Sequence, residues 1–142
     1  MKKNIIYLLS SVFSILLVQC AEPNLPQLIR QHFQPCSEGV ASTQEEKLEY
    51  DYTGGVLSLH YQMIVNCGIS GATATFCMED KDIIIDIYLE GVDNANCMCS
   101  PTISLTMQDI MRGTYNITIN KLQKSSSGDY VERNSYLDTI TL

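Results

Sequence analysis

The chain has 142 residues, with 9 basic and 16 acidic side chains and a formal net charge of −7. A chain of this length suits one domain rather than several. Because no cluster of Arg or Lys stands among aromatic residues, the composition disfavours binding to nucleic acid and to anionic lipid.

The first 19 residues have the pattern of an export signal. Lys2 and Lys3 precede an apolar stretch over residues 5–18, which has the length of a signal-peptide hydrophobic region and is short for a membrane span. We therefore expect residues 1–19 to be a signal peptide and exclude them from the fold. Their removal leaves seven basic and 16 acidic residues, so the mature chain carries a net charge of −9.

The signal ends in LVQC, residues 17–20, which resembles the lipobox of bacterial lipoproteins. The resemblance implies cleavage before Cys20, lipidation of its sulfur and its new amino terminus, and an anchor in the cell envelope, with the outer membrane preferred. Gln19 departs from the Gly, Ala or Ser that usually precedes the cysteine. The alternative is an ordinary secretory signal, with Cys20 a plain cysteine. Both interpretations export the chain to an oxidising compartment, where disulfides persist.

Residues 20–46 show no sustained hydrophobic period, and they contain three prolines. At most one helical turn is expected, over residues 28–33. We interpret the segment as a flexible tether that begins with the lipidated cysteine and lifts the domain off the membrane.

From residue 47 onward, apolar and polar side chains alternate in short runs, which is the period of a strand with one buried face. Gly54-Gly55 marks a hairpin turn between the first two runs. No amphipathic helical pattern of ten or more residues is present. The sequence therefore predicts an all-β domain over residues 47–142, an antiparallel immunoglobulin-like β-sandwich of about seven strands, with a barrel as the alternative. The predicted strands cover residues 48–53, 56–67, 72–78, 83–91, 102–109, 114–123 and 130–142.

One short motif supports the sandwich. DIMRGTYNITI, residues 109–119, resembles the apolar-x-x-Gly-x-Tyr-x-apolar segment of immunoglobulin-like and fibronectin-type domains. The resemblance implies that Gly113 makes a turn and that Tyr115 begins a strand and fixes the corner through its hydroxyl. Ile110 and Ile117 take the apolar positions.

Six cysteines are available for bridges or other chemistry. If Cys20 carries lipid, five disulfide candidates remain, and two bridges among them allow fifteen arrangements. In an extended chain Cys97 and Cys99 project to the same side with a rise of about 6.6 Å, which is awkward for a bond between them. Cys67 ends a strand on its buried face, so the preferred bridge joins Cys67 to Cys97 or to Cys99. The five candidates are Cys36, Cys67, Cys77, Cys97 and Cys99.

The same region supplies the candidates for a metal site, which are Cys67, Cys97 and Cys99 with His60 or Cys77. Structural zinc usually comes from paired Cys-x2–4-Cys knuckles, whereas one Cys-x-Cys stands here. By parity, His60 lies on the polar face of its strand. We therefore favour disulfides and expect no metal and no cofactor.

The side chains for catalysis are sparse. A Ser-His-Asp arrangement needs a histidine base, and the sequence offers only His32, within the expected tether, and His60, in the middle of a strand. No nucleophile elbow is present. The acidic turn over residues 79–82 lacks the glycine and the distal glutamate of a calcium loop. We therefore expect no enzyme activity.

The exported cysteine, the tether, the single β domain and the Cys-x-Cys before a strand resemble small lipoproteins of Bacteroides-type bacteria, many of which have no assigned function. The resemblance implies a location in the cell envelope, outside the cytoplasm. We expect a non-enzymatic binding or structural domain whose partner is a protein, a peptide or a glycan. The alternatives are a metal-binding protein that uses Cys67, Cys97 and Cys99, and a secreted protease inhibitor.

Overall fold

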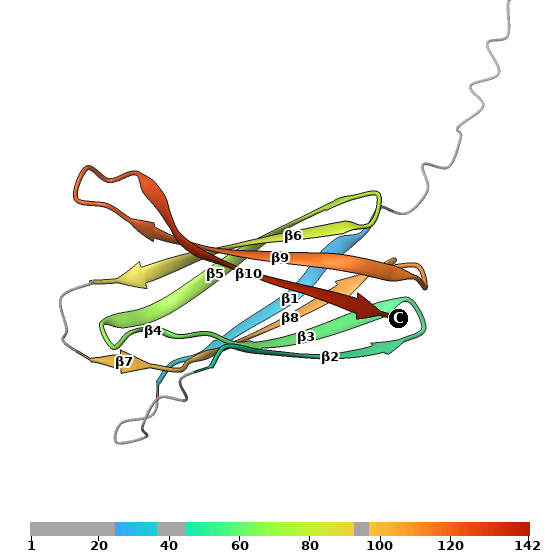
Figure 1. The fold of residues 1–142 in the computed structure, drawn as a ribbon, viewed down its shortest axis with the longest axis horizontal. Helices are drawn as coiled ribbons and strands as arrows, with labels where there is room; N and C mark the ends of the chain where they lie inside the picture. Colours follow the sequence, from blue (N-terminus) through green and yellow to red (C-terminus); the bar gives the residue numbers. More distant parts are fainter. Residues whose placement is uncertain (1–24, 37–44, 93–96) are drawn as a thin grey trace, which may run out of the picture.

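The computed structural model describes residues 25–36, 45–92 and 97–142 (Figure 1). The predicted signal peptide over residues 1–19 and the predicted lipid attachment at Cys20 lie outside the described residues. Within the described segments, no helix is long and apolar enough to cross a membrane.

Ten strands in three sheets build the described part of the chain, so the prediction of an all-β sandwich is confirmed. The first sheet has the order β1-β8-β3-β2, with β1 at Gln27–Gln34, β8 at Thr102–Gln108, β3 at Val56–Gln62 and β2 at Lys47–Thr53. The second has the order β10-β9-β6-β5, with β10 at Tyr130–Thr141, β9 at Thr114–Lys124, β6 at Asp82–Gly91 and β5 at Ile69–Glu79. A short third sheet pairs β4 (Val65–Asn66) with β7 (Met98–Cys99) at one end of the sandwich (Figure 1).

The order of the strands differs from that of an immunoglobulin domain. There the first strand lies beside the second, whereas here β1 lies beside β8, and β2 pairs with β3 across the predicted Gly54-Gly55 hairpin. The expectation of a purely antiparallel sandwich is also wrong for one pair, because β6 and β9 run parallel. The chain crosses between them through β7 and β8 in the other two sheets. The sandwich is therefore confirmed without an immunoglobulin-like strand order.

The tether predicted over residues 20–46 is wrong for Gln27–Gln34, which form β1 at the edge of the first sheet. Leu28 and Phe33 of this strand pack against the core, and its other six residues are exposed. A register shift at Ile29 brings these two side chains, an odd number of positions apart, onto the same face. An edge strand with such a bulge has no period of two, so the alternation of its sequence does not reveal it.

A side chain of β1 also joins the two large sheets. Gln31 Oε1 accepts a hydrogen bond from the Ala74 backbone N–H of β5 (2.7 Å). The folded domain therefore includes β1 and begins before residue 47, the boundary that the sequence predicted.

The core lies between the two large sheets and follows the predicted alternation. Ile83, Ile85 and Ile87 of β6 are completely buried. Burial of a side chain of this size contributes about 1.5–3 kcal/mol, so the alternation determines which face of each strand turns inward. The facing strands β3 and β8 contribute Leu57, Leu59, Tyr61, Ile103, Leu105 and Met107.

The Tyr115 hydroxyl fixes a corner, as the motif implied. It donates a hydrogen bond to the Met111 carbonyl oxygen (2.8 Å), four residues upstream, and the Tyr115 side chain is buried. Gly113 lies just before β9, which begins at Thr114. The expected role of the Tyr115 hydroxyl is confirmed.

Tyr115→Phe should lower the free energy of unfolding by about 1 kcal/mol, because it removes this one hydrogen bond and little else. Urea unfolding measures the change. Tyr50→Phe is the matched control, since the exposed Tyr50 hydroxyl reaches the Thr141 carbonyl oxygen only at 3.4 Å. Equal losses in the two variants would show that the corner does not depend on the Tyr115 hydroxyl.

Candidate functional site

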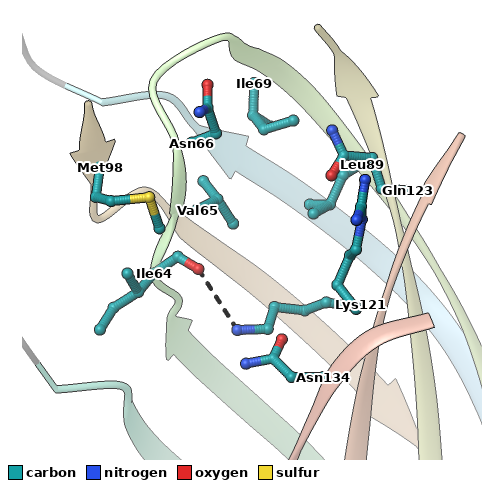
Figure 2. A pocket seen from close by; sticks show the side chains of 10 residues that line it. Ile64, Val65, Asn66, Ile69, Leu89, Met98, Lys121, Gln123 and Asn134 are labelled. Carbon is teal, nitrogen blue, oxygen red and sulfur yellow. Dashed lines mark hydrogen bonds between the residues drawn. The ribbon is translucent and has the colours of Figure 1, made fainter. Parts of the chain in front are cut away.

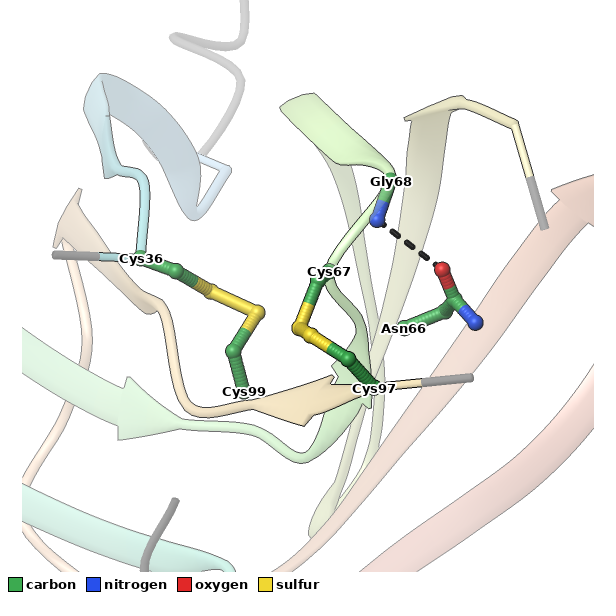
Figure 3. Close-up of a disulfide and its surroundings, with 6 residues drawn as sticks. All are labelled: Cys36, Asn66, Cys67, Gly68, Cys97 and Cys99. Atoms are coloured by element: carbon green, nitrogen blue, oxygen red, sulfur yellow. Dashed lines mark hydrogen bonds between the residues drawn. A yellow bond between two sulfur atoms is a disulfide. The ribbon is translucent and has the colours of Figure 1, made fainter. Parts of the chain in front are cut away.

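Two disulfides lie at the end of the sandwich that carries β4 and β7 (Figure 3). Cys67 pairs with Cys97, with Cα atoms 5.5 Å apart, and Cys36 pairs with Cys99, with Cα atoms 6.0 Å apart. The preferred bridge from Cys67 is confirmed, and of the two partners left open by the sequence it takes Cys97. Among the described cysteines, Cys77 on β5 is free and exposed.

The bridges hold the Cys-x-Cys segment from two sides. The disulfide between Cys67 and Cys97 fixes β7 to the end of β4. A backbone hydrogen bond from the Cys67 N–H to the Cys97 carbonyl oxygen (3.0 Å) joins the same two segments. The Cys99 bond ties the same strand to the segment after β1. Met98, between the two cysteines, pairs with Asn66. A two-stranded sheet is marginal by itself, so these covalent links stabilise it.

A tight turn carries the chain from β4 into β5. Asn66 Oδ1 accepts a hydrogen bond from Gly68 N–H (2.9 Å), in the manner of an Asx turn (Figure 3). The backbone of Gly68 approaches Val92 so closely that a Cβ there would lie 1.9 Å from the Val92 carbonyl oxygen. Glycine is therefore required at this turn, which places Cys67 for its bridge.

A pocket of about 290 Å³ lies between the short sheet and the second large sheet (Figure 2). Val65, Ile69 and Leu89 are buried and form its apolar floor, while Lys121 and Gln123 of β9 supply polar groups. The described residues that line it are Ile64, Val65, Asn66, Ile69, Leu89, Met98, Lys121, Gln123, Arg133 and Asn134.

Lys121 and Gln123 belong to no sequence motif, yet they are buried polar side chains, 1% and 6% exposed. They continue the inward alternation of Tyr115, Ile117 and Ile119 along β9. The signal that finds them is this same period of two. When this period of two is extended past Ile119, it places Lys121 and Gln123 on the core face. The sequence prediction had included only the apolar positions of this strand, which end at Ile119.

Glu46 neutralises Lys121 inside the sandwich. The Lys121 ammonium forms an ion pair with the Glu46 carboxylate and donates a hydrogen bond to the Ile64 carbonyl oxygen (3.5 Å; Figure 2). Glu46 also accepts hydrogen bonds from the Tyr61 hydroxyl (2.8 Å) and the Ile64 N–H (3.2 Å). A buried charge is tolerated when it is paired and hydrogen-bonded. Glu46, which the tether prediction had included, therefore belongs to the folded domain.

The surroundings of this pair shift two pKa values. Burial by itself would raise the pKa of Glu46, but the hydrogen bonds from Lys121, Tyr61 and the Ile64 N–H, with the Lys121 charge, outweigh burial and hold that pKa below its ordinary value. Burial, and then the hydrogen bond to Glu46, raises the pKa of Tyr61 well above its usual range. Tyr61 therefore stays a hydrogen-bond donor to Glu46 at physiological pH.

The lowered pKa of Glu46 predicts a loss of stability in acid. A carboxyl whose pKa is lower in the folded state stabilises the fold above its unfolded pKa, here about 4.5, and the contribution is lost as the pH falls through the folded pKa. We expect the free energy of unfolding of the wild type to fall below about pH 4.5, and that of Glu46→Gln to fall less. Urea unfolding at a series of pH values from neutral into this acid range measures the difference, and equal slopes would contradict it.

A bulge in β10 brings two more polar side chains to the pocket. The register with β9 shifts between Glu132 and Asn134, so Arg133 is the extra residue and Asn134 lies opposite Lys121. Bulges re-aim side chains and are frequent beside active sites. Arg133 and Asn134 both line the pocket, which places a guanidinium and an amide near Lys121 and Gln123.

A second, wider hollow of about 420 Å³ lies on the outer face of β9 and β10. There Asn116 donates a hydrogen bond to Asp82 (2.9 Å) and accepts one from Thr139 (3.4 Å), so its polar groups already satisfy one another. The pocket between the sheets instead reaches buried residues such as Ile69 and Leu89. We therefore take that pocket as the candidate site.

The predicted metal candidates are not brought together. Cys67, Cys97 and Cys99 are in disulfides, and His60 lies on the outer face of β3, where its Nδ1 is hydrogen-bonded with Ser104 Oγ (2.9 Å). Among the described residues, no group of three or more His, Cys, Asp or Glu side chains converges on one point. The metal-binding alternative thus loses the thiolate ligands on which it depended.

No known protein family matches the chain, and no match was found among curated proteins or solved structures. The fold and the site define a β-sandwich closed by two disulfides at the end that holds a pocket. That pocket has an apolar floor and a wall of cationic and amide groups, and the function is inferred from this geometry.

Proposed function

We propose that the protein is an exported, membrane-anchored lipoprotein of the bacterial cell envelope whose β-sandwich is a non-enzymatic binding module for a small molecule. The observation that carries the binding part is the position of Lys121 and Gln123 on the inward face of β9, where they line the pocket. Polar side chains at such positions cost stability relative to apolar ones. Ligand pockets combine an apolar surface with a few polar groups in the same way.

Three features support export and anchoring. The basic and apolar start of the chain has the pattern of a signal peptide, and LVQC at residues 17–20 resembles a lipobox. The two disulfides suit an oxidising compartment. Several acyl chains at Cys20 would hold the protein to a membrane far more firmly than a single chain can.

The composition of the pocket supports binding without turnover. Its described lining residues provide apolar surface, amides, an ammonium and a guanidinium, and they include no Ser, Cys, His, Asp or Glu. Those are the side chains that most often act as nucleophile or general base. Lysine can also take these roles, but the Lys121 ammonium is already engaged in the ion pair with Glu46. A ligand held here would meet hydrogen-bond donors and apolar surface rather than a nucleophile and its base.

Cys20→Ala tests the anchor in a bacterial host fed with labelled palmitate. We expect the wild type to take up the label and to sediment with membranes, and the variant to do neither. Cys77→Ala is the matched control, because Cys77 is an exposed free cysteine in the domain, and it should keep the label. A wild-type protein without label would remove the lipoprotein part of the proposal.

Filling the pocket tests the binding part. Met98 lines the pocket and is 53% exposed, so Met98→Trp adds bulk there without cutting into the core. Met111→Trp is the matched control, since Met111 is 75% exposed and lies outside the lining. Compounds from a broad metabolite library should raise the melting temperature of the wild type and of Met111→Trp, and not that of Met98→Trp. A library without any such compound would remove the small-molecule part of the proposal.

A further inference from the structure

We infer that the ligand of this pocket is a small anionic amphiphile, of the class of an aliphatic carboxylate with about ten non-hydrogen atoms. The inference rests on the proposed function, because it names the ligand class of the same pocket. It is carried by the charge of the walls, by the donors that the protein leaves available there, and by the size of the apolar floor.

The charged side chains that line the pocket are basic, although the protein as a whole is acidic. The described lining residues include Lys121 and Arg133 and no carboxylate, whereas the chain as a whole has a net charge of −7. The Glu46 carboxylate that pairs with Lys121 is outside the lining, and its oxygens are occupied by three donors. An anionic head group in the pocket therefore meets positive and amide groups first.

Hydrogen-bond donors are available at this wall. Gln123 is 6% exposed, and its side-chain amide reaches the surface of the pocket without a hydrogen-bond partner within the described part of the chain. The Lys121 ammonium has three N–H groups, of which Glu46 and the Ile64 carbonyl oxygen take two. Asn134 adds a second amide. A carboxylate accepts several hydrogen bonds at once, and it forms stronger ones with cationic donors than a neutral acceptor does.

The apolar floor and the volume of the pocket determine the hydrocarbon part of the ligand and its length. Figure 2 shows Ile64, Val65 and Met98 with Asn66 on one side of the space, and Lys121 and Gln123 with Leu89 on the other. The pocket therefore offers apolar surface for a hydrocarbon chain next to the polar groups that would meet a head group. Its volume of about 290 Å³ equals about ten water volumes, which matches an aliphatic carboxylate of about eight carbons in total.

Three probes with one eight-carbon chain separate charge recognition from apolar binding: octanoate, octanol and octylammonium. Each is titrated by saturation-transfer NMR against the full-length protein in lipid nanodiscs, with empty nanodiscs as the blank. Arg133→Gln tests the cationic wall, and Arg30→Gln, on an exposed position of β1 outside the lining, is its matched control. Met98→Trp tests the location.

We expect saturable octanoate binding, octanol binding about tenfold weaker, and no saturable octylammonium binding. Arg133→Gln should weaken octanoate about tenfold and leave octanol unchanged, while Arg30→Gln behaves as the wild type. Hexanoate should bind about 16-fold more weakly than octanoate, because each buried methylene is worth about a factor of four. Met98→Trp should bind none of the probes.

Several results would overturn the inference. Equal affinities for octanoate and octanol, or tighter binding of octylammonium, would show that the pocket does not select an anion. Octanoate binding that persists in Met98→Trp would place the acid outside the pocket. If no probe binds while library compounds still stabilise the wild type and not Met98→Trp, the ligand class is wrong and the proposed function stands. If neither probes nor library compounds bind, both fail.

Discussion

Lys121→Met is expected to lower the free energy of unfolding by about 2–3 kcal/mol, although it keeps an unbranched side chain of similar length. The substitution leaves the Glu46 carboxylate without its ion-pair partner. Loss of one member of a fully buried pair costs about 3–5 kcal/mol, and we expect less here because the Glu46 side chain is 16% exposed. Urea unfolding of the wild type and the variant at neutral pH measures the change.

The double variant, Lys121→Met with Glu46→Gln, should recover at least half of that loss, because it contains no unpaired charge. Lys47→Met is the matched control, since Lys47 pairs with Glu49 at the surface and its side chain is 65% exposed. Its effect should stay within about 0.5 kcal/mol. A double variant whose loss equals the sum of the two single losses would contradict the coupling of Lys121 to Glu46.

Replacing Cys36 and Cys99 together by Ala should lower the free energy of unfolding by about 4 kcal/mol, the value that the chain-entropy relation gives for this loop. The two cysteines are 63 positions apart in the sequence, and their disulfide ties the segment after β1 to β7. Denaturant unfolding without reductant measures the loss. Hydrogen exchange shows where it acts, and the amides of β1 should lose protection before those of β3.

Removal of the other bridge, Cys67 to Cys97, should cost slightly less, about 3.5 kcal/mol, because its sequence separation is 30. Cys77→Ala is the control for both double variants and should change stability by no more than about 0.5 kcal/mol, since this cysteine is exposed and outside either bridge. A loss below about 1 kcal/mol for the longer loop would show that β1 is held mainly by its pairing with β8.

The sequence predicts most of the sandwich because half-buried strands record their two faces as a period of two. Ile83, Ile85 and Ile87 are each expected on the core face, and all three are completely buried. The same rule fails for β1, whose bulge at Ile29 places Leu28 and Phe33 on one face. An edge strand with few buried residues leaves too weak a pattern for the sequence to separate it from a tether.

The candidate site depends on pairings between distant parts of the chain, which a local pattern does not contain. Parity places Lys121 on the inward face of β9, but its partner Glu46 lies 75 positions away. Parity likewise favours a bridge from Cys67, but it does not choose between Cys97 and Cys99. The choice of Cys97 follows from the pairing of β4 with β7. The parallel pairing of β6 with β9 likewise joins distant parts of the chain, so a local pattern does not predict it.

Methyl NMR of the full-length protein in nanodiscs tests most directly whether the pocket is the binding site. A compound that stabilises the wild type is titrated in, and the methyl signals of Ile69, Leu89 and Met98, which line the pocket, should shift and saturate together. Those of Met111 and Leu137, exposed elsewhere on the sandwich, should not move. Shifts confined to Met111 or Leu137, with the pocket methyls unchanged, would contradict a ligand site between the short sheet and the second large sheet.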